Sequence, residues 1–197
     1  DHPAVSHLSF TAKAGTTTAL VGHSGSGKST TASLIPRFYD VQQGAVKIGG
    51  VDIREIPHAD LMKMVAFVFQ DPKLFKDTLL ENIRAGRPSA TRDEVLQAAR
   101  LAQCDDILEK FPDGLDTVVG SKGVYLSGGE TQRIAIARAI LKDAPIVVLD
   151  EATAYADPEN EQQIQKAFEG LVKGKTVIMI AHRLSTIQDA DLILVMK

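Results

Sequence analysis

Short apolar runs rich in β-branched residues recur along the chain and predict strands. They cover Thr18–Val21, Val46–Ile48, Val65–Phe69, Ile146–Leu149, Val177–Ile180 and Leu192–Val195. The runs at 146–149 and 177–180 are continuously apolar, which is typical of strands buried on both faces of a parallel sheet. The pattern therefore predicts a largely parallel sheet with both faces covered.

Helical patterns lie between these runs. Thr91 and Glu94 form a capping-box pattern, and the apolar positions that follow share one face: Val95, Ala98, Ala99 and Ala102. A second helix is expected to start with Asp157 as N-cap and Pro158 at its first position, with an apolar stripe of Ile164, Ala167, Phe168 and Leu171. Pro36 is expected to kink or end the helix that precedes it.

Strand and helix alternate near residues 18–35 and 146–197, whereas residues 73–125 show helical patterns joined by loops. We therefore expect one α/β domain with a mostly parallel sheet, an antiparallel β edge and a helical insertion. The predicted core covers about 1–72 and 146–197, and the helical subdomain about 73–140. The chain looks truncated at both ends, because it starts and stops close to strand patterns.

Composition narrows the function classes. The chain has 197 residues and a formal net charge of −3, with both signs mixed along it, which disfavours nucleic-acid binding. Its single cysteine, Cys104, permits no intrachain disulfide and suits a reducing compartment. No apolar run approaches the roughly 20 residues of a membrane span, so the domain itself is expected to be soluble.

The stretch "GHSGSGKST" lies between a predicted strand and a predicted helix and matches G-x-x-x-x-G-K-[ST], the P-loop. Its glycines let the backbone curl around phosphates, Lys28 can reach the β- and γ-oxygens, and the Ser29 hydroxyl can ligate Mg²⁺. His23 is interpreted as a tolerated, non-catalytic position. The predicted nucleotide contacts are Gly22, His23, Ser24, Gly25, Ser26, Gly27, Lys28, Ser29 and Thr30.

Two adjacent carboxylates, Asp150 and Glu151, follow the buried run "IVVLD". The carboxyl ends of strands are where ligands collect in open α/β sheets. Asp150 is predicted to hold Mg²⁺, and Glu151 is predicted to activate the attacking water as a base.

A second glycine-rich helix start occurs at "LSGGE", where free N–H groups at Ser127, Gly128 and Gly129 would attract a phosphate. With "GHSGSGKST", "IVVLDE", the Gln70 segment "VFQDPKLF" and "IAHRLST", this motif set resembles the ATP-binding cassette family along the whole chain. Glu130 stands where the family signature LSGGQ has glutamine.

The resemblance implies a function for this second phosphate-binding segment, Ser127–Gly129, which we call the second cradle. In this family two cassettes pack head to tail, and the signature loop of one closes over the ATP on the P-loop of the other. Ser127, Gly128, Gly129 and Asp157 would then meet the partner's nucleotide. His182 follows a buried strand and is predicted to contact the γ-phosphate, and Gln70 is predicted to contact Mg²⁺ or water.

The loops "FPDGLDTVVG", "LFKDTLLENI" and "LIPRFYDVQQG" resemble those of exporter cassettes. The resemblance implies ATP and Mg²⁺ as ligands and a second cassette, identical or not, as partner. It also implies a transmembrane domain that docks through coupling helices, and a place at the cytoplasmic face of a membrane. Nucleic acid is not expected as a partner. The expected docking surface comprises 37–40, 74–75 and 117–123.

Several positions depart from the family. The segment that precedes the second predicted helix reads Ala154-Tyr155-Ala156-Asp157 where S-A-L-D is common, and Ser121 replaces a frequent glutamate. An adenine-stacking aromatic would fall upstream of Asp1. Two rivals stay open: a non-transport cassette ATPase of translation or chromosome maintenance, and a small P-loop kinase. The first would need a second soluble cassette or a coiled-coil insertion, and the second would need lid arginines.

Overall fold

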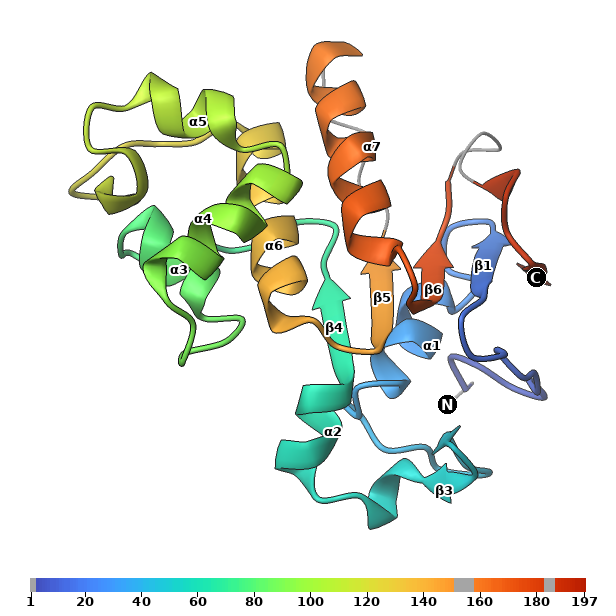
Figure 1. Ribbon diagram of the computed structural model, residues 1–197. Coiled ribbons are helices and arrows are strands. Elements are labelled where there is room, and N and C mark those ends of the chain that lie inside the picture. Colours follow the sequence, from blue (N-terminus) through green and yellow to red (C-terminus); the bar gives the residue numbers. More distant parts are fainter. Residues whose placement is uncertain (1–2, 151–157, 183–186) are drawn as a thin grey trace. The chain divides into compact units, whose positions relative to one another are not determined.

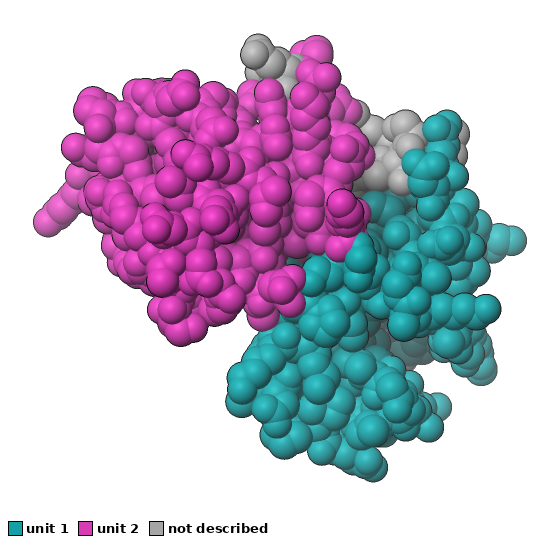
Figure 2. All heavy atoms as spheres, in the orientation of Figure 1, with its two compact units in different colours: residues 1–67, 144–151, 174–197 teal, residues 68–143, 152–173 magenta. Residues whose placement is uncertain are grey.

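The computed structural model describes residues 3–150, 158–182 and 187–197, and the chain forms two compact units. Unit 1 comprises residues 1–67, 144–151 and 174–197, and unit 2 comprises residues 68–143 and 152–173 (Figure 2). None of the helices in the described ranges combines the length and apolar character needed to cross a bilayer.

Unit 1 contains a five-stranded sheet in the order β4-β5-β6-β1-β7 (Figure 1). The bounds are β1 Thr17–Gly22, β4 Val65–Val68, β5 Ile146–Asp150, β6 Thr176–Ile180 and β7 Leu192–Met196. The pairings β1–β6, β1–β7 and β5–β6 are all parallel. The predicted parallel sheet is therefore confirmed, with each strand within two residues of its predicted bounds.

A separate antiparallel hairpin pairs β2 Lys47–Ile48 with β3 Val51–Asp52. Gly49 and Gly50 join them with φ of 57° and 83°, and a two-residue hairpin turn of this kind requires positive φ at both positions. The 3₁₀ turn η1 Ile53–Glu55 and helix α2 His58–Met64 lead from the hairpin into β4.

The core of unit 1 gathers apolar side chains from the sheet and from two helices. Helix α1 Lys28–Leu34 contributes Ala32 and α2 contributes Leu61, which pack with Leu20, Val148 and Ile178 of the strands. The helix ends two residues before Pro36, as its sequence predicted. This packing fixes α1, and with it the P-loop that precedes it, against the carboxyl end of β1.

Unit 2 is built around α6 Gly128–Lys142, which packs against α3 Leu79–Arg84, α4 Arg92–Leu101 and α7 Pro158–Val172. The sides of α6 that face these neighbours bury Ile134, Ile136, Ala137 and Leu141, as expected of a helix surrounded by others. The shorter elements are α5 Asp105–Lys110 and the 3₁₀ turn η2 Gly114–Asp116.

Two local predictions for unit 2 are confirmed. Thr91 and Glu94 form the capping box of α4, with Glu94 N–H donating to Thr91 Oγ1 at 3.2 Å and Thr91 N–H to Glu94 Oε2 at 2.7 Å. Pro158 is the first residue of α7, whereas its predicted N-cap Asp157 lies outside the described residues. The helical middle also contains bridges that the sequence did not predict, Thr78–Val118 and Val119–Val124.

Candidate functional site

The carboxyl edge of the sheet brings three predicted site segments together within unit 1. Asp150 pairs with Ile180, and Ile180 pairs with Leu20, so these residues form one row across three parallel strands. The P-loop leaves this row two residues after Leu20, and His182 lies two residues after Ile180. The register therefore places the phosphate loop, the predicted metal ligand and the predicted histidine at one edge, as expected for a ligand site of an open α/β sheet.

The P-loop closes around its own lysine. Lys28 is almost fully buried, and its Nζ donates to the carbonyl oxygens of Gly22 at 2.9 Å and His23 at 2.8 Å, and to Ser26 Oγ at 3.3 Å. A buried ammonium group requires such acceptors. Phosphate oxygens offer the same chemistry with a full negative charge, so Lys28 is held at the place where an anion would exchange with these acceptors.

Two glycines of the loop leave no room for a side chain. A Cβ on Gly22, whose φ is 155°, would lie 2.2 Å from the Met196 carbonyl oxygen, and one on Gly27, whose φ is 90°, would lie 2.6 Å from the Ala4 carbonyl oxygen. Gly27 is also the N-cap of α1, in a left-handed conformation. The loop can therefore present its backbone N–H groups to a ligand only with glycine at these positions.

Asp150 has the surroundings of a metal ligand. Its Oδ2 accepts a long hydrogen bond from Ser29 Oγ at 3.5 Å, and its buried Oδ1 has no partner among the described residues. Burial raises the pKa of Asp150, although His182, Ser29 and Lys28 favour the charged form. A divalent cation beside Ser29 and Asp150 would satisfy the unpaired oxygen with the hard oxygen ligands that Mg²⁺ prefers. The residues present therefore fit Mg²⁺.

The second cradle belongs to unit 2. Ser127 is the N-cap of α6, and its Oγ accepts from Glu130 N–H at 3.1 Å, while Glu130 Oε2 accepts from Ser127 N–H at 2.8 Å. This capping box was missed from the sequence, although S-x-x-E is its signal. The box uses two of the terminal N–H groups and leaves those of Gly128 and Gly129 without a helical acceptor.

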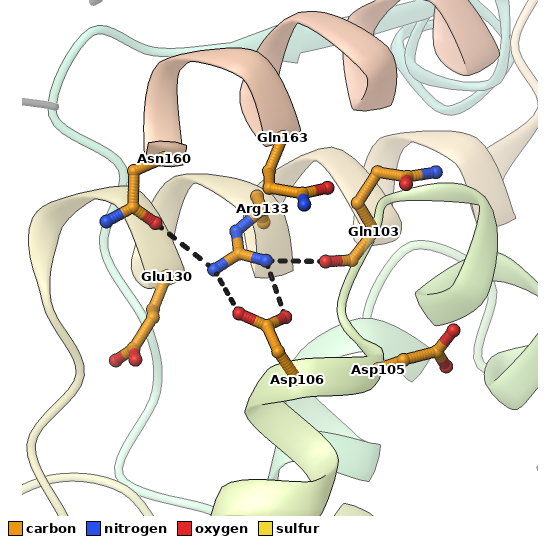
Figure 3. Close-up of a pocket in the computed structure, with 7 residues that line it drawn as sticks. All are labelled: Gln103, Asp105, Asp106, Glu130, Arg133, Asn160 and Gln163. Atoms are coloured by element: carbon orange, nitrogen blue, oxygen red, sulfur yellow. Dashed lines mark hydrogen bonds and ion pairs between the residues drawn. The ribbon is translucent and has the colours of Figure 1, made fainter. Parts of the chain in front are cut away.

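A cluster around Arg133 anchors this helix start to α5 and α7 (Figure 3). Arg133 is 1% exposed and donates to Asp106 at 2.6 and 3.0 Å, to the Gln103 carbonyl at 2.5 Å and to Asn160 Oδ1 at 3.3 Å. Asp106 is partly buried, which favours its neutral form, but the hydrogen bonds and charge of Arg133 outweigh this and lower its pKa.

The cluster borders a polar pocket of about 440 Å³ within unit 2. Its lining is formed by Gln103, Asp105, Asp106, Glu130, Arg133, Asn160 and Gln163. Asn160 also lies against Gly129, where a Cβ would approach its Cγ to 3.1 Å. The start of α7 therefore packs directly on Gly129. Sequence reasoning missed Asp106, Arg133 and Asn160, because no local pattern indicates that they meet.

The roles of several site residues remain predictions. Glu151 and Asp157 lie outside the described residues. Gln70 is exposed in unit 2, and its role at the metal stays a prediction, as does the contact of Ser127, Gly128 and Gly129 with a partner's nucleotide. His23 is exposed, and its Nδ1 lies 2.8 Å from the Ser24 carbonyl oxygen.

Comparisons with known proteins show the family of the chain. A family model described as ABC transporter matches residues 5–154. The chain is 53% identical over 190 residues to an ATP-dependent lipid A-core flippase of Legionella pneumophila (strain Paris), covering 96% of the chain and 32% of the relative. It is 52% identical over 196 residues to an ATP-dependent lipid A-core flippase of Vibrio cholerae, covering 99% and 34%.

A eukaryotic relative, ABC transporter B family member 4 of Dictyostelium discoideum, is 50% identical over 186 residues, with 94% of the chain and 24% of the relative covered. The chain thus spans about a quarter to a third of the length of these relatives. Because the family model covers residues 5–154, which include the P-loop, the signature loop and Asp150, the chain belongs to the ABC transporter family.

Proposed function

We propose that the chain is the ATP-hydrolysing nucleotide-binding domain of a membrane transporter. The observation that carries this proposal is the alignment of the P-loop, Asp150 and His182 at one sheet edge, where Lys28 is buried and Asp150 has an unpaired carboxylate oxygen. The relatives named as ATP-dependent flippases favour transport over the cassette ATPases of translation or chromosome maintenance. They also favour a lipid as the cargo of the whole transporter.

In the proposed mechanism Lys28 exchanges its bonds to the loop carbonyls for bonds to the β- and γ-phosphates. Ser29 and Asp150 would hold Mg²⁺, which supplies positive charge against the phosphate oxygens. Glu151 would accept the proton of the attacking water, and His182 would donate to the γ-phosphate. Each of these groups acts on charge that develops in the transition state, where a fixed donor contributes most.

Two copies would complete each other's sites. Ser127, Gly128 and Gly129 of one copy would contact the γ-phosphate held by the P-loop of the other, so the nucleotide itself would join the two copies. Binding of ATP would then draw the copies together, and loss of phosphate would release them. The free N–H groups of Gly128 and Gly129 and the hydroxyl of Ser127 support this arrangement.

The transmembrane partner would dock on exposed apolar residues of the predicted docking surface. Within unit 2, Phe75 and Val118 are exposed, and the bonds Val119 N–H to Asp77 O at 3.0 Å and Leu79 N–H to Thr117 O at 2.9 Å hold their segments side by side. Such a patch is typical of an interface. Cross-linking of cysteines at 75 and 118 to the membrane portion would support it, and absence of any such cross-link would contradict it.

The test of the proposed function uses Glu151→Gln, which removes the base but keeps the side-chain volume. With ATP and Mg²⁺ this variant should elute as a dimer in size-exclusion chromatography with light scattering, and as a monomer with ADP. Lys28→Met in the same background is the control and should stay monomeric, because the phosphates lose their buried cation. A Glu151→Gln variant that remains monomeric with ATP would contradict the proposal.

A further inference from the structure

Glu130 presents an electrostatic problem at the proposed phosphate cradle. It is the third residue of α6, and it places a carboxylate in the same helical turn whose N–H groups would receive the partner's phosphate. Like charges close together repel, and the helix N-terminus loses part of its attraction for an anion when its own acid occupies it. The ATP-binding cassette signature has neutral glutamine here.

The same carboxylate performs a structural task. Glu130 Oε2 holds the Ser127 N–H and Glu130 N–H binds Ser127 Oγ, so the serine hydroxyl keeps its own proton available for donation. The box therefore orders the cradle and, by its charge, opposes the ligand. A nearby cation would preserve the first effect and cancel the second.

Lys110 is placed to supply that cation. It is the last residue of α5, and its Nζ donates to Glu130 Oε1 at 2.9 Å. The same Nζ lies over the Phe111 ring, 5.3 Å from the centroid. Glu130 is 12% exposed and Lys110 52% exposed. Partial burial opposes the ionisation of Glu130, but Lys110, the Ser127 N–H and Arg133 outweigh it and lower the pKa of Glu130.

The other charged groups near Glu130 do not take this role. Arg133 already binds both carboxylate oxygens of Asp106, and Asp105 adds a further negative charge to the pocket lining. On the α7 side the lining is formed by the amides Asn160 and Gln163, which carry no charge. Among the residues that the structure describes, Lys110 is thus the cation bonded to Glu130.

We propose that Lys110 is a positioning residue of the signature loop: it neutralises Glu130 and thereby lets the Ser127–Gly129 cradle accept the phosphate held by a second copy. This inference rests on the proposed function. Lys110 itself touches no substrate in it and acts through Glu130. Substitution of Lys110 should therefore have little effect on dimerisation when residue 130 carries no charge.

The test measures the dissociation constant of the ATP-driven dimer by sedimentation velocity, with every chain in the Glu151→Gln background. Lys110→Met leaves Glu130 uncompensated and should weaken each composite site about fivefold, the upper range for one partly exposed ion pair. A symmetric dimer has two such sites, so the dissociation constant should rise up to about 25-fold. Lys110→Arg should restore association, because it returns the charge.

The decisive comparison is the same substitution without the negative charge. In a Glu130→Gln background, Lys110→Met should change the dissociation constant less than about threefold, within the low range of surface substitutions. Lys63→Met, an exposed lysine 3.9 Å from Asp60 in α2, is the matched control for loss of a positive charge. Thermal melts by circular dichroism confirm folding, and Lys110→Gln replaces Lys110→Met if that chain misfolds.

The dissociation constants distinguish an action of Lys110 through Glu130 from an action on the fold or on nucleotide directly. An equal loss from Lys110→Met with Glu130 and with Glu130→Gln would show that Lys110 acts on the fold or on nucleotide directly, and would overturn the inference. No loss in either background would also overturn it, while the ATP-driven dimer of the parent would still support the proposed function. A parent chain that does not associate with ATP would overturn both.

Discussion

Replacement of Asp150 by asparagine should have opposite effects on stability with and without nucleotide. Asp150 is partly buried, its Oδ1 has no partner among the described residues, and Ser29 Oγ reaches Oδ2 only at 3.5 Å. The carboxylate therefore destabilises the ligand-free native state relative to a neutral group of the same shape. The uncharged amide has nearly the same shape and keeps an acceptor for Ser29.

The magnitude follows from the cost of leaving a charged atom, rather than a neutral one, without a partner, because the amide of asparagine also places a polar atom at this position. That cost is about 1–3 kcal/mol, and the partial exposure of Asp150 places it at the lower end. Asp150→Asn should therefore stabilise the ligand-free chain by about 1 kcal/mol, which raises Tm by about 2–4 °C for a chain of this size.

With Mg²⁺ and ATP the order of the two melting temperatures should reverse. A ligand at 100 times its Kd stabilises the native state by about 2.7 kcal/mol, and the parent should gain this in full. The variant lacks the charged metal ligand and should gain less than about half of it. The parent should then have the higher Tm.

Differential scanning calorimetry of both chains, each with and without Mg²⁺ and ATP, measures the crossover. Asp60→Asn is the matched control, because Asp60 is an exposed carboxylate of α2 that lies 3.9 Å from Lys63 and has no predicted role at the metal. A lower ligand-free Tm for Asp150→Asn would refute the account of the unpaired oxygen. Equal stabilisation of both chains by Mg²⁺ and ATP would refute its role as a metal ligand.

Three further predictions concern unit 2 and the P-loop. Asp106→Ala should destabilise the chain by about 2 kcal/mol, because it leaves the buried Arg133 without its carboxylate. The control Asp105→Ala should destabilise it by less than about 0.5 kcal/mol. Urea unfolding measures both changes. Cys104 is fully buried and its pKa is raised to about 12, so a thiol reagent at pH 8 should label the native chain about 10³-fold more slowly than the urea-unfolded chain. Gly22→Ala should abolish ATP binding in equilibrium dialysis, because its Cβ would lie 2.2 Å from a backbone oxygen of β7; retained binding would show that the loop can shift.

Asp106 should make the free energy of unfolding decrease as the pH falls into the acid range. Because its pKa is lowered in the folded chain, its contribution is present above the ordinary carboxylate range and is lost as the pH falls through the lowered pKa. Asp106→Asn should therefore flatten the acid limb of the unfolding profile. A variant with the same acid dependence as the parent would contradict this.

The sequence predicted the parts of the fold that local patterns determine. The run Ile146–Leu149 is apolar throughout, and successive residues of β5 are buried, as in a parallel strand covered on both faces, so its sequence pattern predicted it. The capping box at Thr91 was visible for the same local reason. Strand β3 was missed because it has only two residues, although Gly49-Gly50 is a hairpin signal.

The candidate site was predictable where one continuous motif carries it. Gly22–Thr30 supplies loop, lysine and helix start in nine successive residues, so spacing alone predicts the chemistry. Arg133 and Asp106 are 27 positions apart, and Lys110 and Glu130 are 20 apart, so only the packing of α5 on the start of α6 brings each pair together. The same holds for the unpaired oxygen of Asp150, which depends on what the fold places around it.

The central claim is that each nucleotide is bound between two copies, one giving its P-loop and the other its signature loop. It can be tested by mixing Lys28→Met chains with Gly128→Asp chains. Asp at the first turn of a helix is compatible with α6, where Gly128 has no positive φ, but its charge would repel phosphate.

Each variant alone should be inactive in ATP hydrolysis. An equal mixture should recover between about a quarter and about half of the parent rate, because only the mixed dimers contain an intact site and each contains one of two. No recovery in the mixture, or full activity of the Gly128→Asp chain alone, would contradict the claim.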